Sequence, residues 1–256
     1  PAYTSRFTTE LGFPSLLDFG FDGAAKSFAV YGSNSEQLTA FFASDDWYTD
    51  ADSNATQLVK FIGNHDLGRL GREVDLANPG ATDAERVARV ELAYALSSFS
   101  RGVPLVYYGD EQGFTGDGGD KDARQDMMPS QVATYNDDDL IGTGATTADD
   151  NFDMTHPLYQ SLSEFSALRE AHVALRQGAQ IHRYGEGQTG IYAFSRLERS
   201  ERVEYVVALN NAESEDTATF ATFTPDTSFE AVYPAGGAAL QTDTDGNLTV
   251  TVPALD

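Results

Sequence analysis

The sequence contains no cysteine, which excludes disulfide bonds, a thiolate zinc site and a cysteine nucleophile. It also lacks any apolar run near the roughly 20 residues that span a bilayer. Lysine is scarce as well and occurs only at Lys26, Lys60 and Lys121. The missing cysteines leave the cellular compartment open, and the missing apolar run predicts a chain that does not enter a membrane.

Basic residues are few compared with acidic ones, so the formal net charge is -24 and the isoelectric point lies near 4.2. Such a chain repels phosphate-rich partners, so we expect it to bind neither nucleic acid nor anionic membrane surfaces. Acids spread along the chain fit a protein kept soluble in high salt, and an ordinary acidic secreted protein fits equally well. We therefore expect an extracellular or periplasmic location.

The composition that is present is that of a folded protein, with 41% hydrophobic and 11% aromatic residues. A chain of 256 residues forms one large domain, or one medium and one small domain. It begins with Pro1 and shows no charged start followed by an apolar centre. We expect a processed chain or a piece of a longer protein.

Up to Gly178, short apolar runs alternate with amphipathic stretches, which is typical of βα units that form a parallel sheet. The third apolar run is bounded by Gly102 and Gly109, and we expect it to be buried on both faces. The expected strands cover residues 15–21, 58–62 and 104–108, and the expected helices include residues 24–30 and 36–42.

Two further helices carry clear end signals. Thr82 and Glu85 form a capping-box pattern at the start of a long helix that Gly102 is expected to end. Pro157 suits the first turn of the last helix. Between them, residues 110–154 are acidic and rich in glycine, and a loop of that length is usually functional or disordered.

From Gln180 onward the apolar pattern has a period of two, which predicts strands at residues 190–196, 203–209, 217–220, 229–233 and 248–252. Asp245 and Gly246 indicate a type I′ hairpin turn. We therefore predict an α/β domain over residues 1–178 and a small antiparallel β-sandwich over residues 179–256.

The strongest local group of polar residues is Asn64, His65 and Asp66, directly after the apolar strand that ends near Ile62. In parallel βα proteins the carboxyl ends of the strands hold the active site. An acid beside an imidazole suits sugar hydroxyls, which need both acceptors and donors. The alternative is that these residues only turn the chain and cap the next element, and the residues alone leave both interpretations open.

The same tripeptide, following Phe61, resembles the motif that ends the seventh barrel strand in the α-amylase family of retaining glycoside hydrolases. Other segments resemble, in the right order, the family's eighth strand, the loop after it and its closing helix. These segments are residues 102–111, residues 122–127, and residues 155–159 with 168–169.

The resemblance implies a (β/α)8 TIM-type barrel followed by an antiparallel β-domain, with strands six to eight supplied here. It implies retaining hydrolysis of α-glucosidic bonds in α-1,4-glucans, starch or maltooligosaccharides, which uses a carboxylate nucleophile and a carboxylic acid. A third, ionised carboxylate stabilises the positive charge of the transition state. By resemblance Asp66 has that role, His65 binds hydroxyls of the cleaved sugar, and Asn64 helps to hold them.

The resemblance places the nucleophile and the acid in earlier strands, and no such segment occurs here. We therefore expect a partial enzyme whose partner is the N-terminal half. Calcium (Ca2+) is implied too, with ligands mostly in that half, and no residue of this chain is assigned to a metal. The alternative function is a non-catalytic, amylase-like carbohydrate-binding or interaction fragment, although intact His65 and Asp66 count against a relative that has lost its site.

Several acids are weaker candidates. Asp18 could face the barrel mouth, but a buried carboxylate satisfied by a neighbouring strand explains it better. Asp117, Asp120 and Asp122 resemble a calcium-binding loop, although their spacing is not that of an EF-hand. A solvated loop is the better explanation of these three acids.

The remaining candidates are aromatic side chains and histidines. Trp47, Tyr48 and Phe114 could stack on sugar rings, but lone aromatic residues more often pack inside a fold. His172 and His182 have no partner at metal-binding spacing and are expected to fill surface or core positions.

Overall fold

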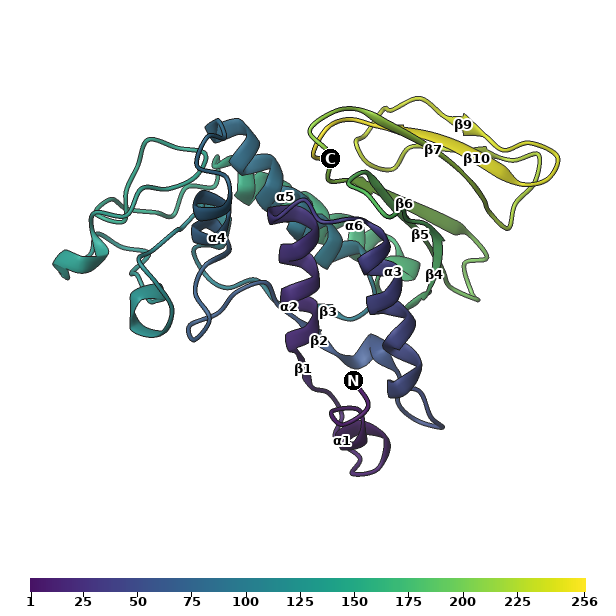
Figure 1. Ribbon diagram of the computed structural model, residues 1–256, viewed down its shortest axis with the longest axis horizontal. Coiled ribbons are helices and arrows are strands. Elements are labelled where there is room, and N and C mark those ends of the chain that lie inside the picture. Colours follow the sequence, from purple (N-terminus) through teal and green to yellow (C-terminus); the bar gives the residue numbers. More distant parts are fainter.

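The computed structural model describes residues 1–256. Helices pack against a small parallel sheet in the first two thirds of the chain, and antiparallel sheets follow (Figure 1). The antiparallel sheets lie at one end of the molecule, and the long loop over residues 110–154 projects at the opposite end. No helix is both long and apolar enough to cross a bilayer.

The parallel sheet has three very short strands in the order β1-β2-β3, which are β1 (Leu17–Asp18), β2 (Val59–Lys60) and β3 (Val103–Pro104). Leu17 pairs with Val59, which pairs with Val103. The three expected strands therefore exist and are parallel, but each is shorter than predicted. β1 ends early because the Asp18 carboxylate accepts a hydrogen bond from the Phe21 N–H (3.1 Å) and caps the next helix.

The expectation that the third run is buried on both faces is wrong. Val103 is 49% exposed, and Leu105, Val106 and Tyr108 are also exposed. The physical reason is position, because β3 has a strand neighbour on one side only. The run has the composition of a central strand, yet within this chain it forms an edge.

The helices mostly follow the predicted order. They are α1 (Arg6–Thr9), α2 (Phe19–Ala25) with a π-helical continuation (Lys26–Val30), α3 (Glu36–Ala43), α4 (Leu70–Ala77), α5 (Asp83–Phe99), α6 (Pro157–Ala171) and α7 (Val173–Gln177). α4 was not predicted. α5 begins with the predicted capping box, in which Thr82 and Glu85 bond each other's backbone N–H. It ends before Gly102 because Ser100 is already extended.

Three basic side chains hold the C-terminal end of α5. Lys60 from β2, Arg169 from α6 and Arg196 from β5 (Ile191–Leu197) all donate to backbone carbonyls of residues 97–100. The Arg196 Nη1 lies 2.8 Å from the Phe99 carbonyl oxygen. These carbonyls have no partner within the helix and carry the negative end of its dipole, so these donors join the parallel sheet, α6 and the antiparallel part.

The antiparallel part contains the sheets β4-β5-β6, β7-β10 and β8-β9. Their bounds are β4 (Ala179–Tyr184), β5 (Ile191–Leu197), β6 (Glu204–Asn210), β7 (Asp216–Ala221), β8 (Ser228–Phe229), β9 (Leu240–Gln241) and β10 (Asn247–Val252). Ile191 of β5 packs in one cluster with Phe220 and Val250 of β7 and β10, so two of the sheets share a core. β4 and β9 were not predicted as separate strands.

Two local predictions in this part are wrong. The segment expected as a strand over residues 229–233 is strand only in Ser228–Phe229. The turn before β10 is not type I′, because Gly246 has a φ of +84° while Asp245 is not among the residues with positive φ. Its backbone is closed instead by a hydrogen bond from the Gly246 N–H to the Asp243 carbonyl.

The largest apolar core crosses from the helical part to the antiparallel part. Tyr192 and Phe194 of β5 pack in the same cluster as Phe28, Tyr94 and Phe165. The change from α/β to antiparallel structure occurs at Gly178, between α7 and β4. The two parts are thus distinct in secondary structure but continuous in packing.

Candidate active site

β2 leads through the buried Ile62 into a tight loop, residues 64–68. Asn64 and Gly68 close this loop with reciprocal backbone hydrogen bonds of 3.1 and 3.0 Å. The Asn64 Oδ1 accepts from the N–H groups of Asp66 (2.8 Å) and Leu67 (2.9 Å). Asn64 therefore shapes the loop, and its side-chain oxygen is used inside it.

Close backbone contacts hold this loop in place. A Cβ on Gly63, which has a φ of +140°, would lie 2.8 Å from the Gly68 carbonyl oxygen. A Cβ on Gly119 would lie 2.6 Å from the Asp66 carbonyl oxygen. That carbonyl accepts a hydrogen bond from the Asp120 N–H at 3.2 Å. The long loop after β3 is thus the support on which residues 64–68 rest.

The Asp66 and His65 side chains are 68% and 57% exposed, and the Asp66 Oδ1 lies 3.3 Å from the His65 Nε2. The guanidinium of Arg124 approaches the same carboxylate, with its Nη2 at 3.8 Å from Oδ1. Arg124 is itself held by Asp120 at 2.5 Å. An acceptor carboxylate, an imidazole and a multiple donor therefore meet at one accessible place, which suits a polyhydroxylated ligand.

Arg124 was not predicted as a site residue, although its segment carries part of the family resemblance. The sequence feature that could have indicated Arg124 is its distance of four positions from Asp120, which allows the two side chains to form an ion pair. That spacing alone does not reveal that Asp66 lies beside them, because residues 64–68 and the long loop meet only in the folded chain.

A buried polar group lies under the loop. Arg69, which directly follows residues 64–68, is fully buried and forms an ion pair with Asp110 (3.2 Å). Asp110 also accepts a hydrogen bond from the Tyr94 hydroxyl at 2.5 Å. Burial raises the pKa of Asp110 to about 6, and the nearby Arg69 and Tyr94 partly oppose that rise.

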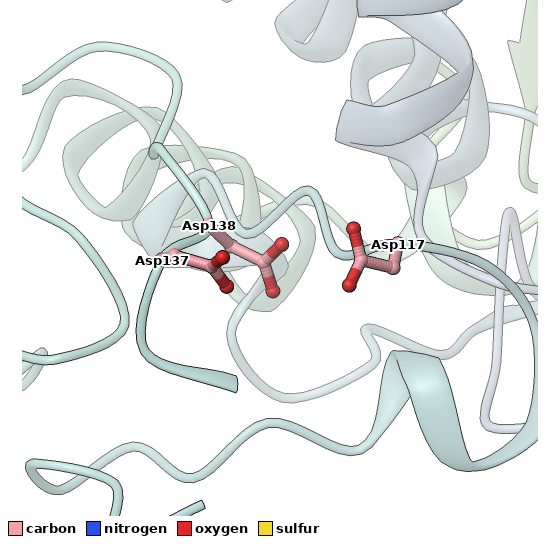
Figure 2. Close-up of side chains that lie close together, drawn as sticks. All are labelled: Asp117, Asp137 and Asp138. Carbon is pink, nitrogen blue, oxygen red and sulfur yellow. The ribbon is translucent and has the colours of Figure 1, made fainter. Parts of the chain in front are cut away.

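Three carboxylates gather elsewhere in the long loop. Figure 2 shows Asp138 between Asp137 and Asp117, and one oxygen from each lies within 4.8 Å of the others. Asp138 is buried and accepts a hydrogen bond from the Gln125 Nε2 at 2.9 Å. Calcium prefers such oxygens but takes six to eight of them, so these three residues by themselves identify no metal.

The sequence favoured a solvated loop for Asp117, Asp120 and Asp122, and Asp117 and Asp120 are indeed exposed. The weaker alternative, in which these three acids gather as a calcium-binding loop, is not the arrangement found. Asp117 meets Asp137 and Asp138, whereas Asp120 bonds Arg124. The cause is the path of the loop, which folds back so that acids about 20 positions apart in the sequence face each other. The spacing of these acids along the sequence does not predict which of them meet when the loop folds back.

Asp18 is buried and paired with Arg101 at 2.7 Å, so it is a satisfied internal acid, as the better explanation predicted. Phe114 is fully buried, with Arg69 placed over its ring at 5.0 Å, so it packs inside the fold, as the favoured explanation predicted, and does not stack on sugar. The Phe114 ring is buried because it packs against the guanidinium of Arg69, which follows residues 64–68.

The other aromatic and histidine candidates make no hydrogen bond to residues 64–68. Trp47 is 59% exposed. The Tyr48 hydroxyl bonds Thr4 at 2.9 Å. The Nδ1 atoms of His172 and His182 bond the hydroxyls of Tyr205 (3.0 Å) and Thr39 (3.3 Å), respectively. Both histidines thus have structural partners.

Residues 1–178 match the family model of the α-amylase catalytic domain. The chain belongs to the α-amylase family. The α-amylase of Streptomyces lividans is 45% identical over 251 residues, which cover 98% of this chain and 27% of that protein. The cyclomaltodextrin glucanotransferase of Bacillus licheniformis is 30% identical over 194 residues, which cover 75% of this chain and 22% of that protein.

The fold of the family is also found in solved structures. An Anoxybacillus α-amylase superposes with a TM-score of 0.75 at 20% identity and covers all of this α-amylase-family chain, which spans 48% of that structure. The chain therefore has the fold of the superposed part of that α-amylase. It spans about a quarter of the length of its Streptomyces relative. Proteins of this family commonly bind calcium.

Proposed function

We propose that this chain is the C-terminal part of a retaining glycoside hydrolase that cleaves α-glucosidic bonds in α-1,4-glucans, starch or maltooligosaccharides. The observation that carries the proposal is the place of Asp66. Its carboxylate is exposed at the C-terminal end of a parallel strand, beside His65 and Arg124. The 45% identity to an α-amylase supports the same substrate class.

In this proposal, residues 1–178 supply the last three strands of a (β/α)8 barrel and residues 179–256 form an antiparallel β-sandwich. The unpaired outer edges of β1 and β3 support this placement. Leu17 of β1 and Val103 of β3 expose 54% and 49% of their surface, and Phe19, directly after β1, exposes 59%. Pairing with the five other strands of a closed barrel would cover them.

The proposed chemistry assigns one role to each exposed polar side chain. Positive charge develops on the sugar ring, and the ionised carboxylate of Asp66 stabilises it electrostatically. His65 and Arg124 provide donors to the hydroxyls of the sugar. Asn64, which the sequence analysis expected to help hold these hydroxyls, uses its Oδ1 within the loop, so in this proposal it contributes by holding the loop in shape. The nucleophile and the acid, about 5 Å apart in retaining enzymes, come from the N-terminal half.

Calcium and location complete the proposal. We expect calcium to be held mainly by that N-terminal half, where it would stabilise the enzyme, and no step above depends on it. An extracellular or periplasmic location is supported by the net charge of -24. Transfer in place of hydrolysis is a second candidate reaction, because some relatives are named cyclomaltodextrin glucanotransferases.

The experiment compares the purified chain, the chain combined with the N-terminal half of its own protein, and the combination carrying Asp66→Asn. Reducing sugar released from starch and the formation of cyclic products are measured. We expect turnover only from the unsubstituted combination. Robust turnover by the chain alone, lost on Asp66→Asn and with no other polypeptide detected by mass spectrometry, would show that other residues supply the catalysis.

The non-catalytic alternative has its own test. A carbohydrate-binding fragment would retain maltooligosaccharide without cleaving it. Affinity electrophoresis of residues 1–256 in a gel containing soluble starch measures this, with Asp66→Asn and His65→Ala as variants. Retention by the chain together with an inactive combination would favour the binding function.

A further inference from the structure

Arg69 connects three segments around the candidate active site. Its Nη1 donates to the Tyr108 carbonyl at the end of the run that contains β3, and to the Asp110 carboxylate at 3.2 Å. Its Nε donates to the Gln125 Oε1 at 3.2 Å. The guanidinium carbon lies 4.3, 4.9 and 5.0 Å from the ring centres of Tyr107, Tyr108 and Phe114.

The position of Arg69 in the chain makes these contacts relevant to the site. Arg69 directly follows residues 64–68 and precedes α4, while Gln125 directly follows Arg124. One buried guanidinium therefore ties the end of the Asp66 loop to the residue next to Arg124. A planar group with several fixed donors suits this task, and the aromatic rings around it restrict its rotation.

We propose that Arg69 is a positioning residue, which is held by Asp110, itself bonded by Tyr94, and which fixes the Asp66 loop against the segment that carries Arg124. This inference rests on the proposed function, because it concerns the placement of Asp66. Arg69 does not touch the substrate in this arrangement. Its effect passes through the backbone of residues 64–68 and through Gln125.

Asp110 makes the arrangement sensitive to pH. The charged and titratable groups around it are Arg69 from the start of α4, Tyr94 from α5, Glu111 from its own turn, and Tyr107. Burial raises the pKa of Asp110 to about 6. Above that pH the carboxylate is ionised and holds Arg69, and below it protonation removes half of the ion pair.

The effect on stability has the opposite sign, which separates positioning from unfolding. Because the folded pKa of Asp110 is raised, the contribution of this group to stability is fully present below its unfolded pKa and is lost as the pH rises through about 6. Acidification through this range should therefore lower activity. Protonation of Asp110 should not lower the melting temperature.

The test uses the assembled enzyme and measures kcat, KM, their pH profiles and the melting temperature. Tyr94→Phe removes the donor that favours ionised Asp110, so the acid limb of the kcat profile should move up by about half a pH unit or more.

Arg69→Lys keeps the charge but loses the planar donors, so kcat should fall about tenfold while KM changes little. Tyr205→Phe removes a tyrosine hydrogen bond to His172 and is the matched control.

An acid limb that stays in place in Tyr94→Phe would overturn the inference, as would wild-type kcat in a folded Arg69→Lys enzyme. If Arg69→Lys does not fold, the Tyr94→Phe profile decides. Asp66→Asn is measured in parallel. Full activity in that variant would refute the proposed function itself, whereas an inactive Asp66→Asn enzyme with an unchanged Tyr94→Phe profile refutes only the positioning role.

Discussion

Asp66 is the residue on which the proposed chemistry depends, and its surroundings explain why it can act. It lies at the end of a parallel strand, on a loop shaped by Asn64, and its carboxylate faces solvent beside His65. None of these contacts buries the carboxylate or covers it with an internal partner. A carboxylate that is oriented but accessible can interact with a substrate directly.

Asp66→Asn should leave the fold intact and reduce kcat of the assembled enzyme by about two orders of magnitude or more. Loss of one preorganised charge costs on the order of 3 kcal/mol in the transition state. Asp46→Asn, which removes another exposed acid, is the matched control and should behave as the unsubstituted enzyme. A variant that keeps a tenth of the activity at an unchanged melting temperature would exclude the proposed role of Asp66.

At the scale of elements, the site is a meeting of two loops. Residues 64–68 are supported by the segment at Gly119, where no side chain fits without moving the Asp66 carbonyl. The support explains how an exposed loop can keep its geometry although it follows a strand of only two residues. Close backbone contact takes the place of a long ladder of strand hydrogen bonds.

Gly119→Ala should therefore displace residues 64–68, reduce kcat about tenfold, and destabilise the protein by about 1–3 kcal/mol. Gly144→Ala is the control, because a Cβ at Gly144 meets nothing within 4 Å and the residue has no positive φ. kcat and the melting temperature are compared for both variants. Equal behaviour of the two would mean that the contact between the loops does not hold the site.

The capping box of α5 gives a second prediction at this scale. Thr82→Ala removes the hydroxyl that accepts from the Glu85 N–H, so the free energy of unfolding should fall by about 1 kcal/mol. Thr82→Ser keeps a hydroxyl and should retain most of the stability. Urea unfolding measures both changes. Because α5 carries Tyr94 in its interior and not at its capped end, kcat should be unaffected.

At the scale of the whole molecule, the net charge of -24 dominates. Self-repulsion among the acids opposes compaction, and cations in solution screen it. We expect the melting temperature to rise between about 0.05 and 2 M chloride, and a neutral osmolyte serves as the comparison. A flat response would exclude adaptation to high salt as the reason for the acidic composition.

The sequence by itself determined the family, the order of most elements and the place of Asp66 after a strand. These features are local, since the tripeptide at residues 64–66, the Thr82 capping box and the start of α6 at Pro157 all lie within a few residues of the structure that they specify. The period-two pattern after Gln180 likewise depends on neighbouring residues, and it predicts β5, β6, β7 and β10 correctly but not the equally long β4.

Only the tertiary structure decided which distant residues meet. It placed Arg124 beside Asp66, buried Arg69 on Asp110, and turned the third apolar run into an exposed edge. It also grouped Asp117 with two acids about 20 positions away. The physical reason is common to all of these features, because each depends on the path by which the chain returns on itself, and that path is determined by packing across the whole fold and not by the spacing of residues along the sequence.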